Sequence, residues 1–142
     1  MSPVIDSHIH IDFYVEEERA LILNELETYN VEALIAVSNN LQSAEKVLSL
    51  AKINPKIKPA IGYHPEQSLP TEQELYDIHK LINLHHQQIV GIGEVGLPQY
   101  LRRGNPNMSI DPYFKILETF IQLAKLYNLL VILHISGFKI EI

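Results

Sequence analysis

Residues 4–10 read Val4-Ile5-Asp6-Ser7-His8-Ile9-His10, and this stretch predicts a short strand that ends in two histidines. Side chains at positions i and i+2 of a strand project from the same face. We therefore expect the two imidazoles to lie side by side, with the aspartate behind them. Neutral imidazole is a common ligand for zinc, iron and similar ions, so the pair forms half of a metal site. A histidine pair hydrogen-bonded in a polar cleft is the alternative interpretation.

Length and composition limit the class of protein. The chain has 142 residues, the size of one domain, and its hydrophobic fraction of 46% is enough to bury a core. It contains no cysteine, which excludes disulfides and thiolate metal sites. Residues 1–14 contain Asp6, His8, His10 and Asp12, and no apolar run reaches the length of a membrane span. We therefore expect a cytoplasmic protein without a signal peptide or a membrane segment.

The formal net charge of −6 concerns the choice of partner. A surface that coats nucleic acid broadly needs an excess of basic residues, which this chain lacks. An enzyme that meets a phosphodiester locally remains possible, because bound cations can supply the positive charge there.

Apolar segments alternate with helical patterns along the whole chain. Strands are expected at residues 4–10, 33–37, 57–62, 89–94 and 130–134. Helices are expected at about residues 15–29, 41–53, 71–86 and 112–127, with a long loop at 98–106. Residues 38–40 offer cap residues for the helix that follows them, and Thr71 is predicted to cap the next helix. Asp111 is predicted to cap the last helix, with Pro112 at its first position. The βαβαβαβαβ order is typical of a parallel sheet with right-handed crossovers.

Two parallel architectures fit this order, a doubly wound open sheet and a (β/α)8 TIM barrel. A nucleotide-binding open sheet carries a glycine-rich loop after its first strand, whereas residues 8–12 of this chain read His-Ile-His-Ile-Asp. The α/β barrel is therefore the favoured interpretation. A whole barrel takes about 250 residues. We expect residues 1–142 to form a single domain, the N-terminal portion of a barrel truncated to about five strands and four helices.

Polar side chains stand where the predicted strands end. His8 and His10 end the first strand, His64 follows the third, Glu94 ends the fourth and His134 ends the fifth. Parallel strands bring their carboxyl ends to one rim, which is where barrel enzymes keep their chemistry. Three or four histidines and one carboxylate, without cysteine, suit a catalytic metal or two ions bridged by the carboxylate.

Other polar residues have weaker claims to function. Histidines 79, 85 and 86 lie on or near the third predicted helix, where a solvated surface is the expected environment. Arg102 and Arg103 lie in the loop after the fourth strand and are candidates for binding a substrate phosphate. A plain exposed loop is the alternative for the two arginines.

Four motifs in this order resemble the TatD-related metal-dependent hydrolases, the TatD DNase family. They are DSHIHIDF at 6–13, IGYHP at 61–65, IGEVGL at 92–97 and VILH at 131–134. The resemblance covers the chain up to residue 136. It implies a (β/α)8 barrel and one or two divalent metal ions, Mg²⁺, Mn²⁺ or Zn²⁺.

The same resemblance implies a role for each site residue. His8 and His10 would hold one ion, Glu94 would bridge two, and His134 would hold the second. His64 would line the site of the substrate phosphate, which makes Glu94 and His64 the catalytic candidates. The family hydrolyses ester bonds, and DNA is its best-known substrate. The expected partner is therefore DNA or a small phosphodiester.

The chain also departs from the family pattern. Pro98 stands where the family has Asp, and Ser136 stands where an Arg is common. The tail at residues 137–142 does not match the family's continuation. The family takes a further metal-binding His from strand six and a proton-accepting Asp from strand eight, and neither strand is present. We therefore expect residues 1–142 to hydrolyse phosphodiesters weakly or not at all.

An open half-barrel also exposes two unpaired strand edges, which favours self-association. Two alternatives to the hydrolase interpretation stay open. One is a non-catalytic or interaction protein that keeps the half-barrel without metal. The other is an amidohydrolase-type enzyme acting on C–N or lactone bonds, although such barrels usually have lysine where this chain has Glu94.

Overall fold

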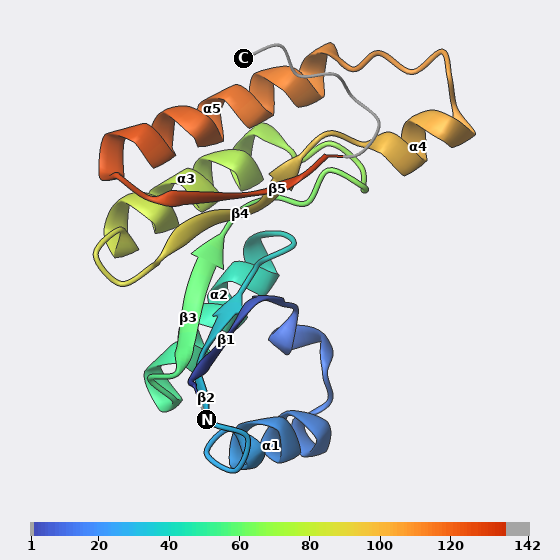
Figure 1. Cartoon of the computed structure of the whole chain (residues 1–142). Helices are drawn as coiled ribbons and strands as arrows, with labels where there is room; N and C mark the ends of the chain where they lie inside the picture. Colours follow the sequence, from blue (N-terminus) through green and yellow to red (C-terminus); the bar gives the residue numbers. More distant parts are fainter. Residues whose placement is uncertain (1, 136–142) are drawn as a thin grey trace.

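Each strand of the sheet pairs in parallel with the strand that follows it in the chain. The computed structural model describes residues 2–135. The strands are β1 (Val4–Ile9), β2 (Val31–Ala36), β3 (Ile57–Ile61), β4 (Gly91–Gly96) and β5 (Leu130–His134). They form a half-barrel in the order β1-β2-β3-β4-β5 (Figure 1). The predicted parallel α/β sheet of TIM-barrel type, with five strands, is confirmed.

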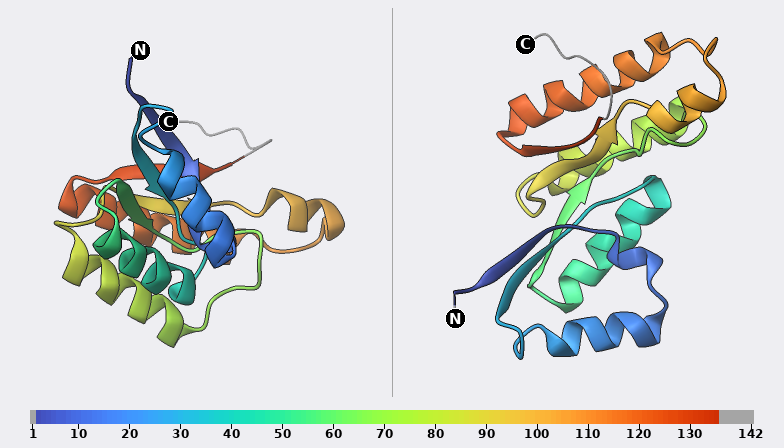
Figure 2. Two further views of the ribbon diagram at one scale, coloured as in Figure 1. Left: turned by 90° about the horizontal axis from the view of Figure 1, so that it is seen from below. Right: turned by 45° about the vertical axis from the view of Figure 1, so that its right-hand side comes forward.

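The connections between the strands are helical. The helices are η1 (Ile11–Phe13), α1 (Glu16–Glu25), α2 (Leu41–Ile53), α3 (Glu72–His85), α4 (Gln99–Gly104) and α5 (Asp111–Tyr127). Helices α2, α3 and α5 lie on the same side of the sheet, as the views in Figure 2 show. No helix within residues 2–135 combines the length and the apolar character that crossing a membrane requires.

Local chemistry sets the ends of the long helices. The side chain of Asn40 accepts a hydrogen bond from the amide of Ser43 (2.9 Å), and the hydroxyl of Thr71 accepts one from the amide of Glu74 (3.1 Å). The predicted cap at Thr71 is confirmed, and Asn40 is the cap among the three candidates at 38–40. Helix α5 ends at Asn128, whose left-handed backbone (φ 53°) is a common way to end a helix.

The core lies in two clusters between the sheet and these helices. The larger cluster joins β3 and β4 to α2, α3 and α5, and it includes Ile78, Ile92 and Phe120, each fully buried. The smaller one joins β2 to η1, α1 and α2 around Ile11 and Val47. Burial of these apolar faces accounts for the alternation of strands and helices in the sequence.

Glycines let the strand ends approach closely. A Cβ atom on Gly62 would lie 2.8 Å from the carbonyl carbon of Gly93, and one on Gly96 would lie 2.0 Å from the carbonyl oxygen of His134. No side chain fits at either distance. The ends of β3, β4 and β5 are therefore packed backbone against backbone.

Several boundaries differ from the predicted ones. Helix α1 ends at Glu25 instead of residue 29, because residues 26–30 form a turn in which Asn30 has a left-handed backbone (φ 54°). Strand β4 extends two residues beyond the predicted end, so Glu94 lies inside the strand. The expected loop at 98–106 contains α4, and α5 begins at Asp111 itself, with Pro112 in its first turn.

His79 differs from the expected solvated surface. It is half-buried, its Nε2 lies 3.3 Å from the hydroxyl of Thr119, and its ring meets Phe120 edge-on with centroids 5.1 Å apart. Burial lowers the pKa of His79 below its ordinary value. This histidine belongs to the packing of α3 against α5.

Replacing Phe120 with alanine should lower the free energy of unfolding by about 3–5 kcal/mol, because a large, fully buried ring is lost. Leu126→Ala on the same helix is the matched control, since that side chain is 70% exposed. The control should change the free energy of unfolding by less than about 0.5 kcal/mol. Urea denaturation followed by circular dichroism measures both, and equal losses would contradict the described packing of α5.

Candidate metal centre

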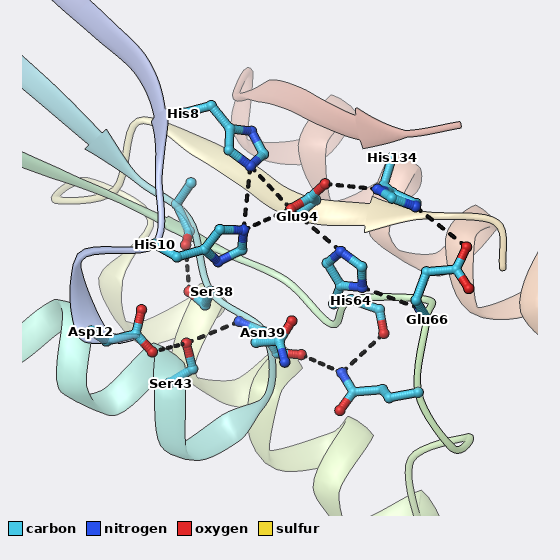
Figure 3. A network of polar contacts seen from close by, with 12 residues as sticks. His8, His10, Asp12, Ser38, Asn39, Ser43, His64, Glu66, Glu94 and His134 are labelled. Atoms are coloured by element: carbon cyan, nitrogen blue, oxygen red, sulfur yellow. Dashed lines mark hydrogen bonds and ion pairs between the residues drawn. The ribbon is translucent and has the colours of Figure 1, made fainter. Parts of the chain in front are cut away.

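The buried carboxylate of Glu94 lies at the centre of a group of histidines (Figure 3). Its Oε2 is 3.1 Å from Nε2 of His8, 3.2 Å from Nε2 of His10 and 3.6 Å from Nε2 of His64. Its Oε1 is 3.1 Å from Nδ1 of His134. Side chains on β1, β4 and β5, and in the segments that follow β1 and β3, therefore meet at the carboxyl ends of the strands.

The end of β1 sets the positions of the first two histidines. Asp6 accepts a hydrogen bond from the amide of His8 (3.0 Å), and the Nε2 atoms of His8 and His10 are 3.4 Å apart. The ring of His10 stacks on Phe13, with centroids 4.8 Å apart and planes 13° from parallel. The short helix η1 thus supports one face of the His10 ring.

Backbone contacts set the position of Glu94. The amide of Glu94 donates to the carbonyl of Ser38, and the amide of Ser38 donates to the carbonyl of Gly93 (3.1 Å each). Only 7% of the Glu94 side chain is exposed. The carboxylate is therefore held below the open face, at the base of the histidine group.

His64 has a different environment from the other histidines. Its Nδ1 accepts a hydrogen bond from the amide of Glu66 (3.1 Å). A neutral imidazole with an acceptor at Nδ1 carries its proton on Nε2, the nitrogen that faces Glu94. Burial lowers the pKa of His64, although the charge of Glu94 acts in the opposite direction. The His64 nitrogen that faces Glu94 thus carries a proton rather than a lone pair.

Opposing effects act on the ionisation of Glu94. Burial alone would raise its pKa, but the close polar contact of His10 and the positive charge available on His64 and His8 outweigh burial. The net result is a pKa of about 2. Glu94 is therefore an anion at neutral pH, a form that attracts cations and accepts protons poorly.

The residues present fit a divalent cation. Oε2 of Glu94 is buried, and none of its close histidine contacts has hydrogen-bond geometry. Two sets of ligand atoms lie within 4.8 Å of one another, from His8, His10 and Glu94 and from His64, Glu94 and His134. A carboxylate oxygen without a hydrogen bond, facing imidazole nitrogens, is a suitable ligand set for zinc, manganese or a similar ion.

The structure brings together His8, His10, His64, Glu94 and His134, the five residues singled out at the strand ends. The two candidate arginines lie on α4 with exposed side chains, and the guanidinium of Arg103 is 5.7 Å from the ring centroid of Tyr100. The ring centroids of Tyr100 and His134 are in turn 6.1 Å apart, so α4 lies beside the histidine group.

Sequence reasoning missed Glu66. Its Oε1 lies 3.3 Å from Nε2 of His134, and only 12% of its side chain is exposed. The one available signal was its position two residues after His64, in the loop that follows β3. The predictions about residue 136 and residues 137–142 lie outside the described part of the chain.

Comparison with known proteins agrees with this geometry. The family model described as TatD related DNase matches residues 5–141. The chain belongs to the TatD-related DNase family. A protein of Haemophilus influenzae described as an uncharacterized metal-dependent hydrolase is 42% identical over 140 residues, covering 98% of this chain and 55% of its own length. The human protein named deoxyribonuclease TATDN3 is 31% identical, covering 92% of this chain and 51% of its own length.

Solved structures show the same fold for this TatD-family chain. The crystal structure of YjjV, a TatD homologue from Escherichia coli K12, superposes with a TM-score of 0.75 at 26% identity. The superposition covers 92% of this chain and 49% of the YjjV chain. A TatD-family hydrolase from Entamoeba histolytica gives a TM-score of 0.73 at 20% identity. This chain therefore spans about half the length of the relatives it matches.

Metal binding is directly testable by calorimetry with Zn²⁺ or Mn²⁺. We expect His10→Ala to weaken metal binding more than about 10-fold. Losing a residue that hydrogen-bonds to a metal ligand already costs about that much affinity, and losing the ligand itself should cost at least as much. His86→Ala is the matched control, because His86 stacks on Tyr127 and is not among the residues around Glu94. The control should bind as the wild type does. Purified protein with less than about 0.1 ion per chain and no binding would instead favour a half-barrel without metal.

Proposed function

We propose that this chain functions as a divalent-metal-dependent hydrolase of ester bonds, with DNA or a smaller phosphodiester as substrate. The observation that carries this proposal is the buried carboxylate of Glu94, which is contacted by imidazoles from both ends of the sheet. Family membership supports the reaction class, and the relative named deoxyribonuclease TATDN3 supports the substrate.

We assign the ligands as follows. His8, His10 and Glu94 would hold one cation, and Glu94 with His134 would hold a second. When bound, the cations lower the pKa of water towards neutrality and offset charge on the phosphoryl oxygens. Mg²⁺, Mn²⁺ and Zn²⁺ are the candidate ions, and the histidine-rich ligand set favours Zn²⁺ or Mn²⁺ over Mg²⁺.

His64 and the arginines bind the substrate phosphate in this proposal. The Nε2 proton of His64 points into the site, where it is available to an anionic oxygen. Arg102 and Arg103 lie on α4 beside the site, and guanidinium groups bind phosphates in a bidentate manner. The net charge of −6 makes such local positive groups important for an anionic substrate.

Proton transfer limits the activity that we expect from residues 1–142 alone. The attacking water must lose a proton to a base. In the described part of the chain, the carboxylates that contact the imidazole rings of the site histidines are Glu94 and Glu66. Glu94 has a pKa of about 2, and Glu66 already accepts hydrogen bonds from two amides. Neither suits the role of general base, so hydrolysis should be slow.

We expect hydrolysis of bis-p-nitrophenyl phosphate and single-stranded DNA to require Mn²⁺ or Zn²⁺. Turnover should stay below about 0.1 s⁻¹, well under the roughly 10 s⁻¹ of a typical enzyme. Glu94→Ala should reduce it to background, whereas Glu72→Ala, an exposed change on α3, should not. Hydrolysis that survives a chelator or Glu94→Ala would contradict the proposed site. Fast turnover abolished by Glu94→Ala would support the site and contradict the expected weakness.

Self-association is a second part of this proposal. Strands β1 and β5 each pair with one neighbour in the described sheet, so each has an open edge. Both carry exposed apolar side chains, including Ile5 (56% exposed) and Leu133 (48% exposed). Open edges with apolar side chains favour pairing with another chain.

Sedimentation velocity over a range of concentrations measures this association. We expect dimers or larger species, and Leu133→Lys should shift the distribution towards monomer by placing a charge on β5. Leu126→Lys, on the exposed face of α5, should leave the distribution unchanged. A single monomeric species at every concentration would contradict association through these edges.

A further inference from the structure

We propose that Glu66 is a positioning residue that sets which ring nitrogen carries the proton in His64 and in His134. This inference rests on the proposed metal-dependent function, because it explains why one histidine offers a lone pair and the other a proton. Glu66 lies in the loop between β3 and α3, and its side chain reaches His134 on β5 (Figure 3).

Backbone amides hold the side chain of Glu66 in place, in addition to its contact with His134. Its Oε1 accepts a hydrogen bond from the amide of Tyr100 (2.8 Å), and its Oε2 accepts one from the amide of Leu101 (2.9 Å). Both carboxylate oxygens are therefore fixed by α4. The carboxylate links the loop after β3 to the segment after β4 and to the end of β5.

The ring of His134 lies between two carboxylates. Its Nδ1 is 3.1 Å from Oε1 of Glu94, and its Nε2 is 3.3 Å from Oε1 of Glu66. The two ring nitrogens point in different directions, so Glu66 is not placed to share an ion held at Nδ1. Glu66 instead accepts the Nε2 proton, which leaves the Nδ1 lone pair directed at the Glu94 side. A carboxylate that receives the second ring proton fixes the orientation of a metal-binding histidine and strengthens it as a ligand.

The backbone of Glu66 has the opposite effect on His64. The amide of Glu66 donates to Nδ1 of His64, so the proton of the neutral ring lies on Nε2, facing Glu94. One residue thus directs a lone pair of His134 and an N–H of His64 towards the same carboxylate. This arrangement makes His134 a ligand and His64 a donor to an anionic oxygen.

A purely structural alternative is that Glu66 only joins its loop to α4. That role would account for the two amide contacts but not for the His134 contact. The two possibilities differ in what they predict for the His134 ring, because a loop contact alone would leave metal affinity and the ring proton unchanged.

The experiment compares Glu66→Ala and Glu66→Gln with wild type and with Glu72→Gln, an exposed change at the start of α3. Zn²⁺ affinity is measured by calorimetry. We expect Glu66→Ala to weaken binding by about 10- to 100-fold, the usual effect of losing a carboxylate behind a ligand histidine. Glu66→Gln should fall between this variant and wild type, because its amide oxygen still accepts the Nε2 proton but carries no charge. Glu72→Gln should match wild type.

The second measurement is the histidine ring proton in nitrogen–proton NMR spectra of the metal-free and Zn²⁺-loaded protein. We expect a slowly exchanging Nε2 proton on His134 in wild type and Glu72→Gln, and its loss in Glu66→Ala. Circular dichroism establishes that each variant is folded. If Glu66→Ala is not folded, the Zn²⁺ affinity of Glu66→Gln tests the proposal, and an affinity equal to that of wild type would overturn it.

The outcomes separate the two proposals. Wild-type Zn²⁺ binding that is unchanged in both Glu66 variants would overturn the role of Glu66 and leave the metal site intact. A wild type that binds no Zn²⁺ would refute the proposed function, and the ring proton would then decide the role of Glu66. A slowly exchanging His134 Nε2 proton that persists in Glu66→Ala would overturn that role in either case.

Discussion

A buried carboxylate in contact with four imidazoles is the interaction on which the rest of this half-barrel depends. Placing an ionised carboxylate at 7% exposure costs several kcal/mol unless neighbouring charges and polar groups offset it. Here the compensation comes from histidines on β1 and β5 and in the loop after β3, and it is large enough to lower the pKa of Glu94 to about 2. The carboxyl ends of the strands must therefore lie level with one another, so that the histidines reach Glu94. The close backbone packing at Gly62 and Gly96 meets that requirement.

The histidines around this carboxylate are not equivalent, although the sequence shows the same residue type at each position. Their second ring nitrogens have different partners: an amide for His64 and a carboxylate for His134. In a site built from imidazoles, these outer partners decide which nitrogen offers a lone pair and which offers a proton. The loop after β3, which contains Glu66, thus gives His64 and His134 different roles although both are histidines.

Much of the fold and of the site could be predicted from residue patterns. Apolar runs and caps such as Thr71 located the sheet and the long helices, and side chains at the ends of parallel strands must converge on one rim. Helix α4 was not predictable, since its six residues carry no apolar periodicity and none is buried. Glu66 was missed for a related reason: its partners lie 34, 35 and 68 positions away, and no local pattern encodes such contacts.

The distribution of the proposed ligands along the chain would link folding to metal binding. His8 lies on the first strand of the described sheet and His134 on the last, so the centre exists only when the whole sheet has formed. Contacts of such long range form slowly in folding, because much chain entropy is lost before they contribute. A cation bound there would hold the outermost strands together, so that metal binding and folding would form a single equilibrium.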